Sequence, residues 1–127
     1  MRRLWWIVIV GAALGCLDNS ATSGTLKVKL TTPNAGSDGA ILFTVTGPAV
    51  PLTTTAATGL RLFAQPPPLA ATNHFAVTGA LPSGTIMTIE VPDVSRSGAY
   101  TATIQQVAAT NYQLRPSLAG YTLTVSP

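Results

Sequence analysis

The sequence has little of the chemistry that catalysis and metal binding require. Its 127 residues include one cysteine, one histidine and four acidic residues, and only 9% of them are charged. A zinc site needs several His or Cys ligands, so Cys16 and His74 cannot form one. A Ser-His-Asp triad needs an imidazole beside its nucleophile, yet His74 alternates with Phe75 and Val77 and is expected to face solvent. The sequence therefore argues against zinc enzymes and triad hydrolases.

The acidic residues do not form a pair suited to acid–base catalysis. A glycosidase needs two carboxylates flanking one bond, whereas Glu90 is expected to point out of a strand. Asp93 is expected to cap a turn and to pair with Arg96 on the surface. The loop "NAGSDG" (34–39) lacks the alternating acidic ligands of a calcium loop and is predicted to be a hairpin turn. With no glycine-rich phosphate loop either, we predict no enzyme activity, no metal and no cofactor.

Basic residues are also few. The formal net charge of +3 includes Arg2 and Arg3, and the rest of the chain is nearly balanced. No basic stripe follows a phosphate backbone, so nucleic-acid binding is not expected. The apolar run from Leu4 to Leu17 would reach only about 21 Å as a helix, against a hydrocarbon core of about 30 Å. Behind a basic head, this run predicts a secretory signal peptide, which would remove both arginines.

Cys16 lies where the apolar run ends, and three fates are open to it. It is an ordinary residue of a signal peptide that is cut after Ser23, a buried apolar filler, or a site of acylation. The segment "Ala13-Leu14-Gly15-Cys16" resembles the lipobox of bacterial lipoproteins, in which the nucleophilic thiol of the cysteine takes a diacylglyceryl group. That family usually has leucine three residues before the cysteine, where this chain has Ala13.

The lipobox resemblance implies how the chain is organised and where it resides. It implies a signal peptide over residues 1–15, a lipidated cysteine and polar tether over 16–24, and a domain over 25–127. The protein would then be exported and attached to a membrane of the bacterial envelope. Leu17 follows the cysteine in place of aspartate, which favours the outer membrane or the cell surface. Without acylation, a secreted or soluble periplasmic protein is expected.

Threonine, valine, glycine and proline dominate the rest of the chain, which favours strands and turns. Apolar and polar residues alternate with a period of two in seven segments. In the segment 25–30, Lys27 and Lys29 share the open face, which is typical of an edge strand. The segment 39–47 is apolar on both faces at its start and is expected to be a central strand. The number and spacing of these segments predict an all-β fold, an antiparallel two-sheet β-sandwich of about seven strands. The segments are 25–30, 39–47, 59–64, 73–79, 84–91, 98–107 and 120–125.

One segment carries a more specific resemblance. "IEVPDVSRSGAYTATI" (89–104) resembles the corner between strands E and F of immunoglobulin-like domains. The resemblance implies that Tyr100 is the corner tyrosine, whose hydroxyl bonds the backbone upstream, and that Ala102 stands where antibody domains have a cysteine. The chain lacks the cysteine pair and the buried tryptophan of those domains. The segments "DGAILFTVTG" and "LPSGTIMTIEV" are similar to strands of cohesin-type sandwiches.

An anchored sandwich without acid–base groups predicts a non-catalytic module. We expect it to bind an envelope protein or a polysaccharide, and to contact the membrane through its lipid. A structural accessory lipoprotein of a larger envelope assembly is the alternative. Among the aromatic side chains, Tyr112 alone is expected to be exposed and Phe63 is assigned to the core, so a glycan site has little support.

The predicted strand count also places the loops. If each of seven strands crosses the sandwich once, loops 32–38, 65–73 and 92–98 share the end that points away from the tether. Loops at one end of a sandwich are where such domains usually recognise partners. The predicted partner-binding residues are therefore Asn34, Asp38, Pro66, Pro67, Pro68, Asn73, Asp93 and Arg96.

Overall fold

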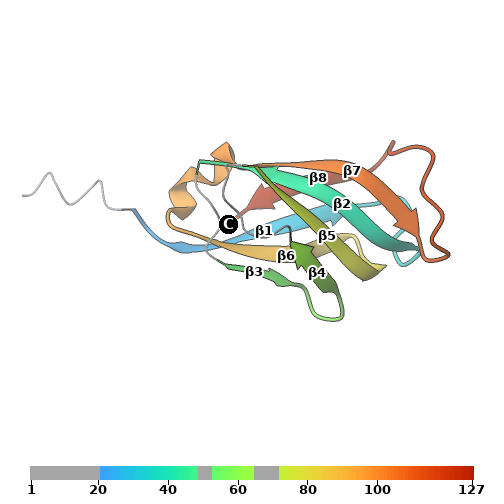
Figure 1. Cartoon of the computed structure of the whole chain (residues 1–127). Coiled ribbons are helices and arrows are strands. Elements are labelled where there is room, and N and C mark those ends of the chain that lie inside the picture. The colour runs from blue at the N-terminus through green and yellow to red at the C-terminus, as the bar shows by residue number, and fades with distance from the viewer. Residues whose placement is uncertain (1–20, 49–52, 65–71) are drawn as a thin grey trace, which may run out of the picture.

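The structure, a computed structural model, describes residues 21–48, 53–64 and 72–127. These residues form two four-stranded antiparallel sheets (Figure 1), which confirms the predicted all-β sandwich. The architecture is consistent with an immunoglobulin-like fold. The strands are β1 (Gly24–Thr31), β2 (Asp38–Thr46), β3 (Thr53–Ala56), β4 (Arg61–Ala64), β5 (Thr72–Leu81), β6 (Gly84–Val91), β7 (Thr101–Ala109) and β8 (Thr122–Ser126), with a 3₁₀ helix, η2 (Val94–Ala99), before β7.

Successive strands alternate between the two sheets. The β1 sheet has the order β3-β6-β1-β8, and the β2 sheet has the order β4-β5-β2-β7. The connection from β4 to β5 is the one that stays within a sheet, and every other connection crosses to the opposite sheet. β1 and β2 therefore do not pair, so the turn over 33–37 is an arch between sheets and not the predicted hairpin.

The core is built from the inward halves of the alternating strands. Leu26, Val28 and Leu30 of β1 are buried, whereas Lys27 and Lys29 are exposed. Opposite them, the β2 sheet contributes Phe43, which packs against Phe75 of β5 with ring centroids 5.7 Å apart. Burying such side chains is the main favourable term in folding, at about 1.5–3 kcal/mol each. The predicted inward faces of β7 and β8 also pack on this core, through Tyr100, Ala102, Ile104, Tyr121, Leu123 and Val125.

The sandwich has two ends, which we name from β1. The near end is where β1 begins, and it also holds the end of β6, η2 and the start of β7. The far end is where β1 finishes, and it holds the start of β2, the end of β5 and the loop over 110–121 (Figure 1). The segment N-terminal to residue 21 therefore enters at the end opposite to the 110–121 loop.

Two predictions about strand placement were wrong. β1 is central, between β6 and β8, and not an edge; its lysines mark only the solvent face of the sheet. The predicted strand over 59–64 is β4, in the β2 sheet, but it is preceded by a four-residue strand that was not predicted, β3, in the β1 sheet. The additional strand reverses the direction of the chain, so every later loop lies at the end opposite to the predicted one. The prediction that β2 is central is confirmed.

Residues 92–100 form the predicted corner into β7. Asp93 caps η2, because its Oδ1 accepts hydrogen bonds from the backbone N–H of Ser95 at 3.1 Å and from Ser95 Oγ at 2.6 Å. The predicted capping role is confirmed, with Ser95 as the hydrogen-bond partner. Tyr100 is buried at the start of β7 beside Gly47. The hydroxyl bond implied for Tyr100 stays a prediction.

We expect Asp93 to titrate below the ordinary aspartate value. The hydrogen bond from Ser95 is the first cause that lowers the pKa of Asp93 from 3.8. A lowered pKa in the folded state means that the cap stabilises the fold above pH 3.8 and that this contribution is lost as the pH falls through the lower value. Carboxyl titration by NMR measures the pKa, and Ser95→Ala should raise it toward 3.8. An unchanged pKa in that variant would show that Ser95 does not hold the charge.

Among residues 21–48, 53–64 and 72–127, no helix has the length and apolar character needed to cross a bilayer. Cys16, the apolar run before it and Pro66, Pro67 and Pro68 lie outside the described residues.

Candidate binding face

The outer faces of the two sheets differ in chemistry. On the β1 sheet, the outward positions pair Lys27 with Thr88 and Ser126, and Lys29 with Thr85 and Thr124. Threonine, serine, lysine and glutamate fill this face across all four strands. A sandwich face of this kind is well solvated and has no need of a partner.

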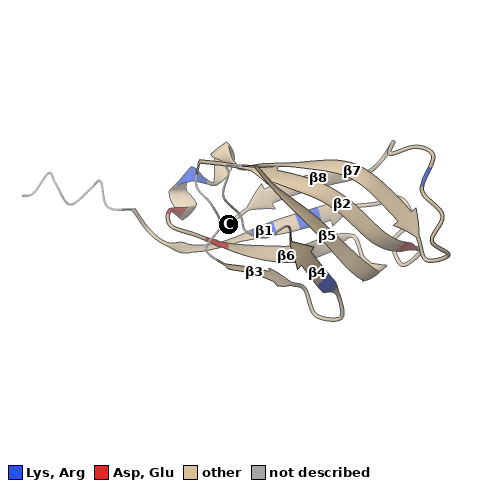
Figure 2. Cartoon of the chain, viewed as in Figure 1, with Lys and Arg blue, Asp and Glu red and all other residues tan. Residues whose placement is uncertain are grey.

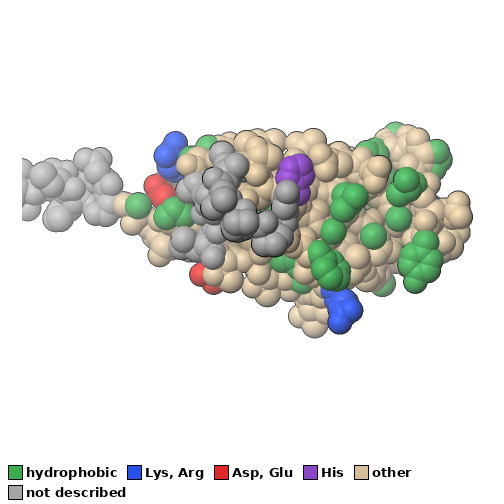
Figure 3. Space-filling view, viewed as in Figure 1, with side chains coloured by type: hydrophobic (Ala, Val, Ile, Leu, Met, Phe, Trp, Pro, Cys, Tyr) green, Lys and Arg blue, Asp and Glu red, His purple; other side chains and the backbone are tan. Residues whose placement is uncertain are grey.

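The outer face of the β2 sheet is apolar in its far half. Phe63 of β4 is 56% exposed and Leu42 of β2 is 42% exposed. The strand register places both opposite Ala76 of β5, so the three side chains form one row across the sheet. Figure 3 shows hydrophobic side chains gathered on the face in view, toward the far end. Contiguous exposed apolar surface on a small protein marks an interaction site.

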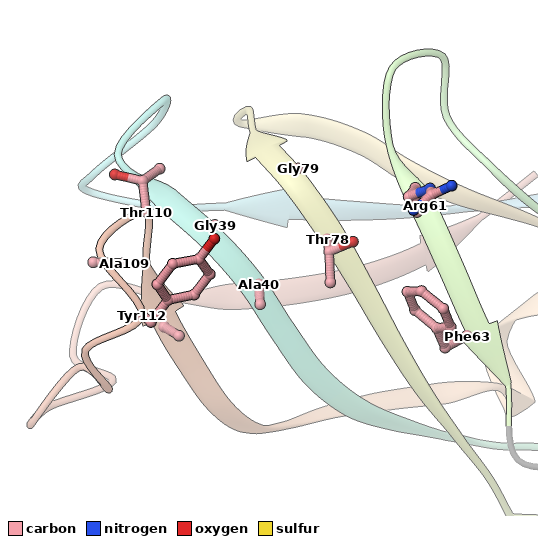
Figure 4. A pocket seen from close by; sticks show the side chains of 10 residues that line it. Gly39, Ala40, Arg61, Phe63, Thr78, Gly79, Ala109, Thr110 and Tyr112 are labelled. Carbon is pink, nitrogen blue, oxygen red and sulfur yellow. The ribbon is translucent and has the colours of Figure 1, made fainter.

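A hollow over this face is flanked by two exposed aromatic side chains (Figure 4). Its volume is about 530 Å³, and its floor consists of small residues of β2, β5 and β7. Phe63 stands on the β4 side, and the loop after β7 brings Tyr112 to the other side. We call this hollow the aromatic trough, defined by Ala40, Arg61, Phe63, Thr78, Ala108, Thr110 and Tyr112.

A second hollow continues the trough along the same face toward the near end. It shares Phe63 with the aromatic trough and is lined by Leu42, Ala76, His74 and Gln105. Gln105 is on this face by the ordinary alternation of β7, and the bulge after it, where the register with β2 shifts between Leu42 and Phe43, turns Gln106 outward as well. His74 is exposed here, as the alternation predicted.

Tyr112 has an unusual backbone. It is 92% exposed, and its φ of 67° is the one positive value of a non-glycine residue among the described residues. Left-handed backbone costs a side-chain-bearing residue roughly 1–2 kcal/mol, and asparagine or glycine adopts it more easily. The conformation is held because Tyr112 N–H donates to the carbonyl of Ala109 at 3.0 Å and Ala109 N–H donates to the carbonyl of Gln113 at 2.8 Å.

The base of the loop that carries Tyr112 is held by a buried carboxylate, Asp38. Asp38 is 0% exposed, and its Oδ1 accepts hydrogen bonds from Arg115 Nε and Tyr121 Oη, both at 2.9 Å. Its Oδ2 accepts a hydrogen bond from Thr32 Oγ1 at 2.5 Å. The hydrogen bond that Arg115 donates to Asp38 is the first cause that raises the pKa of Arg115. Asp38 therefore joins the arch after β1 to the middle and to the C-terminal end of the 110–121 loop.

Charge around the trough is of one sign. Arg61 lines the rim, and the described acidic residues lie elsewhere: Asp38 is buried, Glu90 is on the β1 sheet and Asp93 caps η2 (Figure 2). The ion pair found in the described part of the chain is the one between Arg115 and Asp38, so Arg61 has no carboxylate partner there.

The structure separates the predicted partner-binding residues. Asn34 and Asp38 lie at the far end, whereas Asp93 and Arg96 lie in the corner at the near end. Asp38 and Asn73 are buried, at 0% and 6% exposure. The described residues of this set therefore do not form a single docking surface, because the additional strand β3 reverses the ends at which the later loops lie and because Asp38 is part of the internal network.

Phe63 and Leu42 were missed as surface residues, although the sequence contains a signal for each. Phe63 is two positions from Arg61, and alternation puts both on the same, solvent-facing side of β4. Leu42 belongs to the segment that is apolar on both faces, so one of its faces had to meet either a covering element or solvent. The prediction that Tyr112 is exposed is confirmed.

No group of three or more His, Cys, Asp or Glu side chains is placed to hold a metal ion in the described ranges. The arrangement offers a concave apolar surface, two rings, hydroxyl groups and one cation, which are features typical of ligand-binding sites. Searches with the sequence against protein-family models and curated proteins, and with the structure against solved structures, gave no match.

Proposed function

We propose that this protein is a non-catalytic binding module, held on the bacterial envelope by a lipid on Cys16, whose protein or polysaccharide partner docks on the outer face of the β2 sheet. The observation that carries this proposal is the contrast between the two outer faces. One is filled by threonine and lysine, and the other exposes Phe63 and Leu42 beside Tyr112. Solvation alone gives no reason for such a difference between faces of one small sandwich.

The position of the trough supports this orientation. The chain enters the sandwich at the near end, and the trough lies over the far half of the β2 sheet. An anchor N-terminal to residue 21 would leave the trough turned away from the membrane. This arrangement suits a module that reaches a partner beyond its own bilayer. The outer face of the β2 sheet thus takes the place of the loop surface that the sequence predicted as the docking site.

The lipid anchor is tested with Cys16→Ser in cells fed radiolabelled palmitate. We expect the unaltered chain to carry label and to sediment with membranes, and the variant to lose both properties, because serine lacks the thiol that is acylated. Ser20→Ala, nearby in the tether, is the control and should keep both. Equal labelling of the Cys16 variant would contradict the lipoprotein hypothesis.

The docking face is tested with matched pairs of threonine substitutions. Leu42→Thr/Phe63→Thr removes the apolar row, and Lys27→Thr/Lys29→Thr changes the opposite face in the same way. We expect the first pair to weaken saturable binding to isolated envelopes by about tenfold or more, and the second pair to leave it unchanged. Equal binding by both variants would reject the face. Stable self-association of the unaltered chain, lost in the first variant, would favour the structural accessory role.

A further inference from the structure

We infer that the aromatic trough binds an acidic polysaccharide, with Phe63 and Tyr112 stacking on sugar rings and Arg61 pairing with a carboxylate of the chain. This inference rests on the proposed function and names the chemical class of the partner. It is carried by the backbone at Tyr112, by the shape of the trough, by its charge and by the state of the neighbouring strand edges.

The first observation is that a fully exposed ring is kept at a strained position. Tyr112 gains no burial from its own fold, since 92% of it is exposed, and its φ of 67° is unfavourable for tyrosine. Its neighbour Asn111, a residue that tolerates this backbone, accepts a hydrogen bond from Gln113 N–H at 3.1 Å instead. The turn requires left-handed backbone at this position but does not require a tyrosine, and backbone strain of this kind clusters at functional positions. The ring is therefore placed for a ligand.

The second observation is the shape of the trough. Its floor is made of residues no larger than threonine, so the two flanking rings rise above it on opposite sides (Figure 4). Sugar rings present rows of C–H groups, and these pack well on the electron-rich face of an aromatic ring. Thr78 and Thr110 supply hydroxyl groups that both donate and accept hydrogen bonds. An open trough of this form fits a chain of linked sugar rings.

The third observation is the charge. Arg61 lines the trough and has no carboxylate near it in the part of the chain that the structure describes. Guanidinium groups pair with carboxylates in a two-pronged geometry. A second copy of this protein that docked through the same face would bring another Arg61 and no acidic side chain to it. The charge thus favours an acidic ligand over self-association.

The fourth observation argues against an extended peptide. A peptide commonly joins a sheet by adding a strand to a free edge. The edge strand beside Phe63, β4, has only four residues. The edge of β7 at the far end is already occupied, since Arg115 N–H donates to the carbonyl of Val107 at 2.7 Å and Ala108 forms a bridge with Leu114. Neither edge beside the trough offers a long strand for pairing.

The test is affinity electrophoresis of the full chain, kept soluble with a non-ionic detergent. Gels contain alginate, polygalacturonate, hyaluronate or, as a neutral comparison, dextran. We expect retardation by at least one of the three acidic polymers and none by dextran, with methyl esterification of the retarding polymer abolishing the effect. Failure of all three acidic polymers to retard the chain would overturn the inference.

Variants locate the binding. Tyr112→Asn, Phe63→Thr and Arg61→Gln should each raise the dissociation constant about tenfold, while Lys27→Gln on the opposite face should leave it unchanged. Tyr112→Asn should also unfold at the same or a higher temperature, because asparagine tolerates the left-handed backbone. Lost binding without lost stability separates a ligand contact from a structural role. Retained binding in all three trough variants would place the polysaccharide elsewhere and reject the inference.

The two proposals fail in different ways. If no acidic polymer binds while the Leu42→Thr/Phe63→Thr pair still abolishes binding to envelopes, the docking face stands and its partner is not an acidic polysaccharide. Protease treatment of the envelopes would then identify the partner as a protein if it removes the binding sites. If Leu42→Thr/Phe63→Thr leaves binding to envelopes unchanged, and the three trough variants leave the retardation by acidic polymers unchanged, both proposals are wrong.

Discussion

Replacing Asp38 by alanine is expected to cost about 3–5 kcal/mol of unfolding free energy. The carboxylate is fully buried and accepts hydrogen bonds from Thr32, Tyr121 and Arg115. Alanine would leave the Thr32 and Tyr121 hydroxyl groups of two buried hydrogen bonds without this acceptor, and the partly exposed Arg115 without its ion-pair partner. Against a total stability of about 5–15 kcal/mol, the loss is large, and chemical denaturation would measure it directly.

Asp38→Asn separates the charge from the hydrogen bonds. Asparagine keeps one oxygen that can accept from Tyr121 and Arg115, so we expect it to be clearly less destabilising than alanine. Hydrogen exchange should show the loss locally as well, as faster exchange of the Arg115 amide, which is bonded to Val107 in the unaltered chain. Glu90→Gln on the exposed face of β6 is the control. If Asp38→Ala were as stable as this control, the network would contribute nothing.

Gly47→Ala is expected to be the second most damaging of these substitutions, at about 1–3 kcal/mol. A Cβ atom built at Gly47 would overlap Cδ1 and Cε1 of the Tyr100 ring. Tyr100 is buried at 6% exposure and directly precedes β7, so its ring can move only by disturbing the core at the near end. Thermal or urea unfolding of the variant measures the cost.

A double-mutant cycle checks the reason for that cost. In a Tyr100→Ala background the ring is absent, and Gly47→Ala should then cost close to nothing. Gly98→Ala is a suitable comparison, because a Cβ atom there would meet no atom within 4 Å. The same cost for Gly47→Ala with and without the ring would mean that the backbone at this position, and not Tyr100, is responsible.

The sequence was sufficient to predict the architecture because its alternation is strong. β1 buries Leu26, Val28 and Leu30 and exposes the residues between them, and a period of two is itself the signature of a half-buried strand. Strand order was not accessible in this way, since the alternation says which face is buried but not which strand lies alongside. The lysines of β1 suited either an edge or the open face of a central strand.

The candidate site was harder to predict, for two physical reasons. Four-residue strands such as β3, "TTTA", carry too short a pattern to be recognised, and missing one of them reversed the ends to which Asp93 and Arg96 were assigned. Phe63 was placed in the core because large aromatic side chains are usually buried. In the structure it is exposed, because it shares the solvent-facing side of the short strand β4 with Arg61.

The alternation of strands between the sheets has a consequence for how the chain folds. β1 lies between β6 and β8, so the first strand of the chain cannot complete its pairing until the last strand is present. β4 and β5 are the one pair of consecutive strands that hydrogen-bond to each other. Contacts between residues far apart in sequence make folding slow, on a scale of roughly milliseconds to seconds. A chain still being synthesised has no second neighbour for β1 until residues 122–126 have emerged. Any machinery that threads this protein through a narrow channel would therefore receive it before its fold can close.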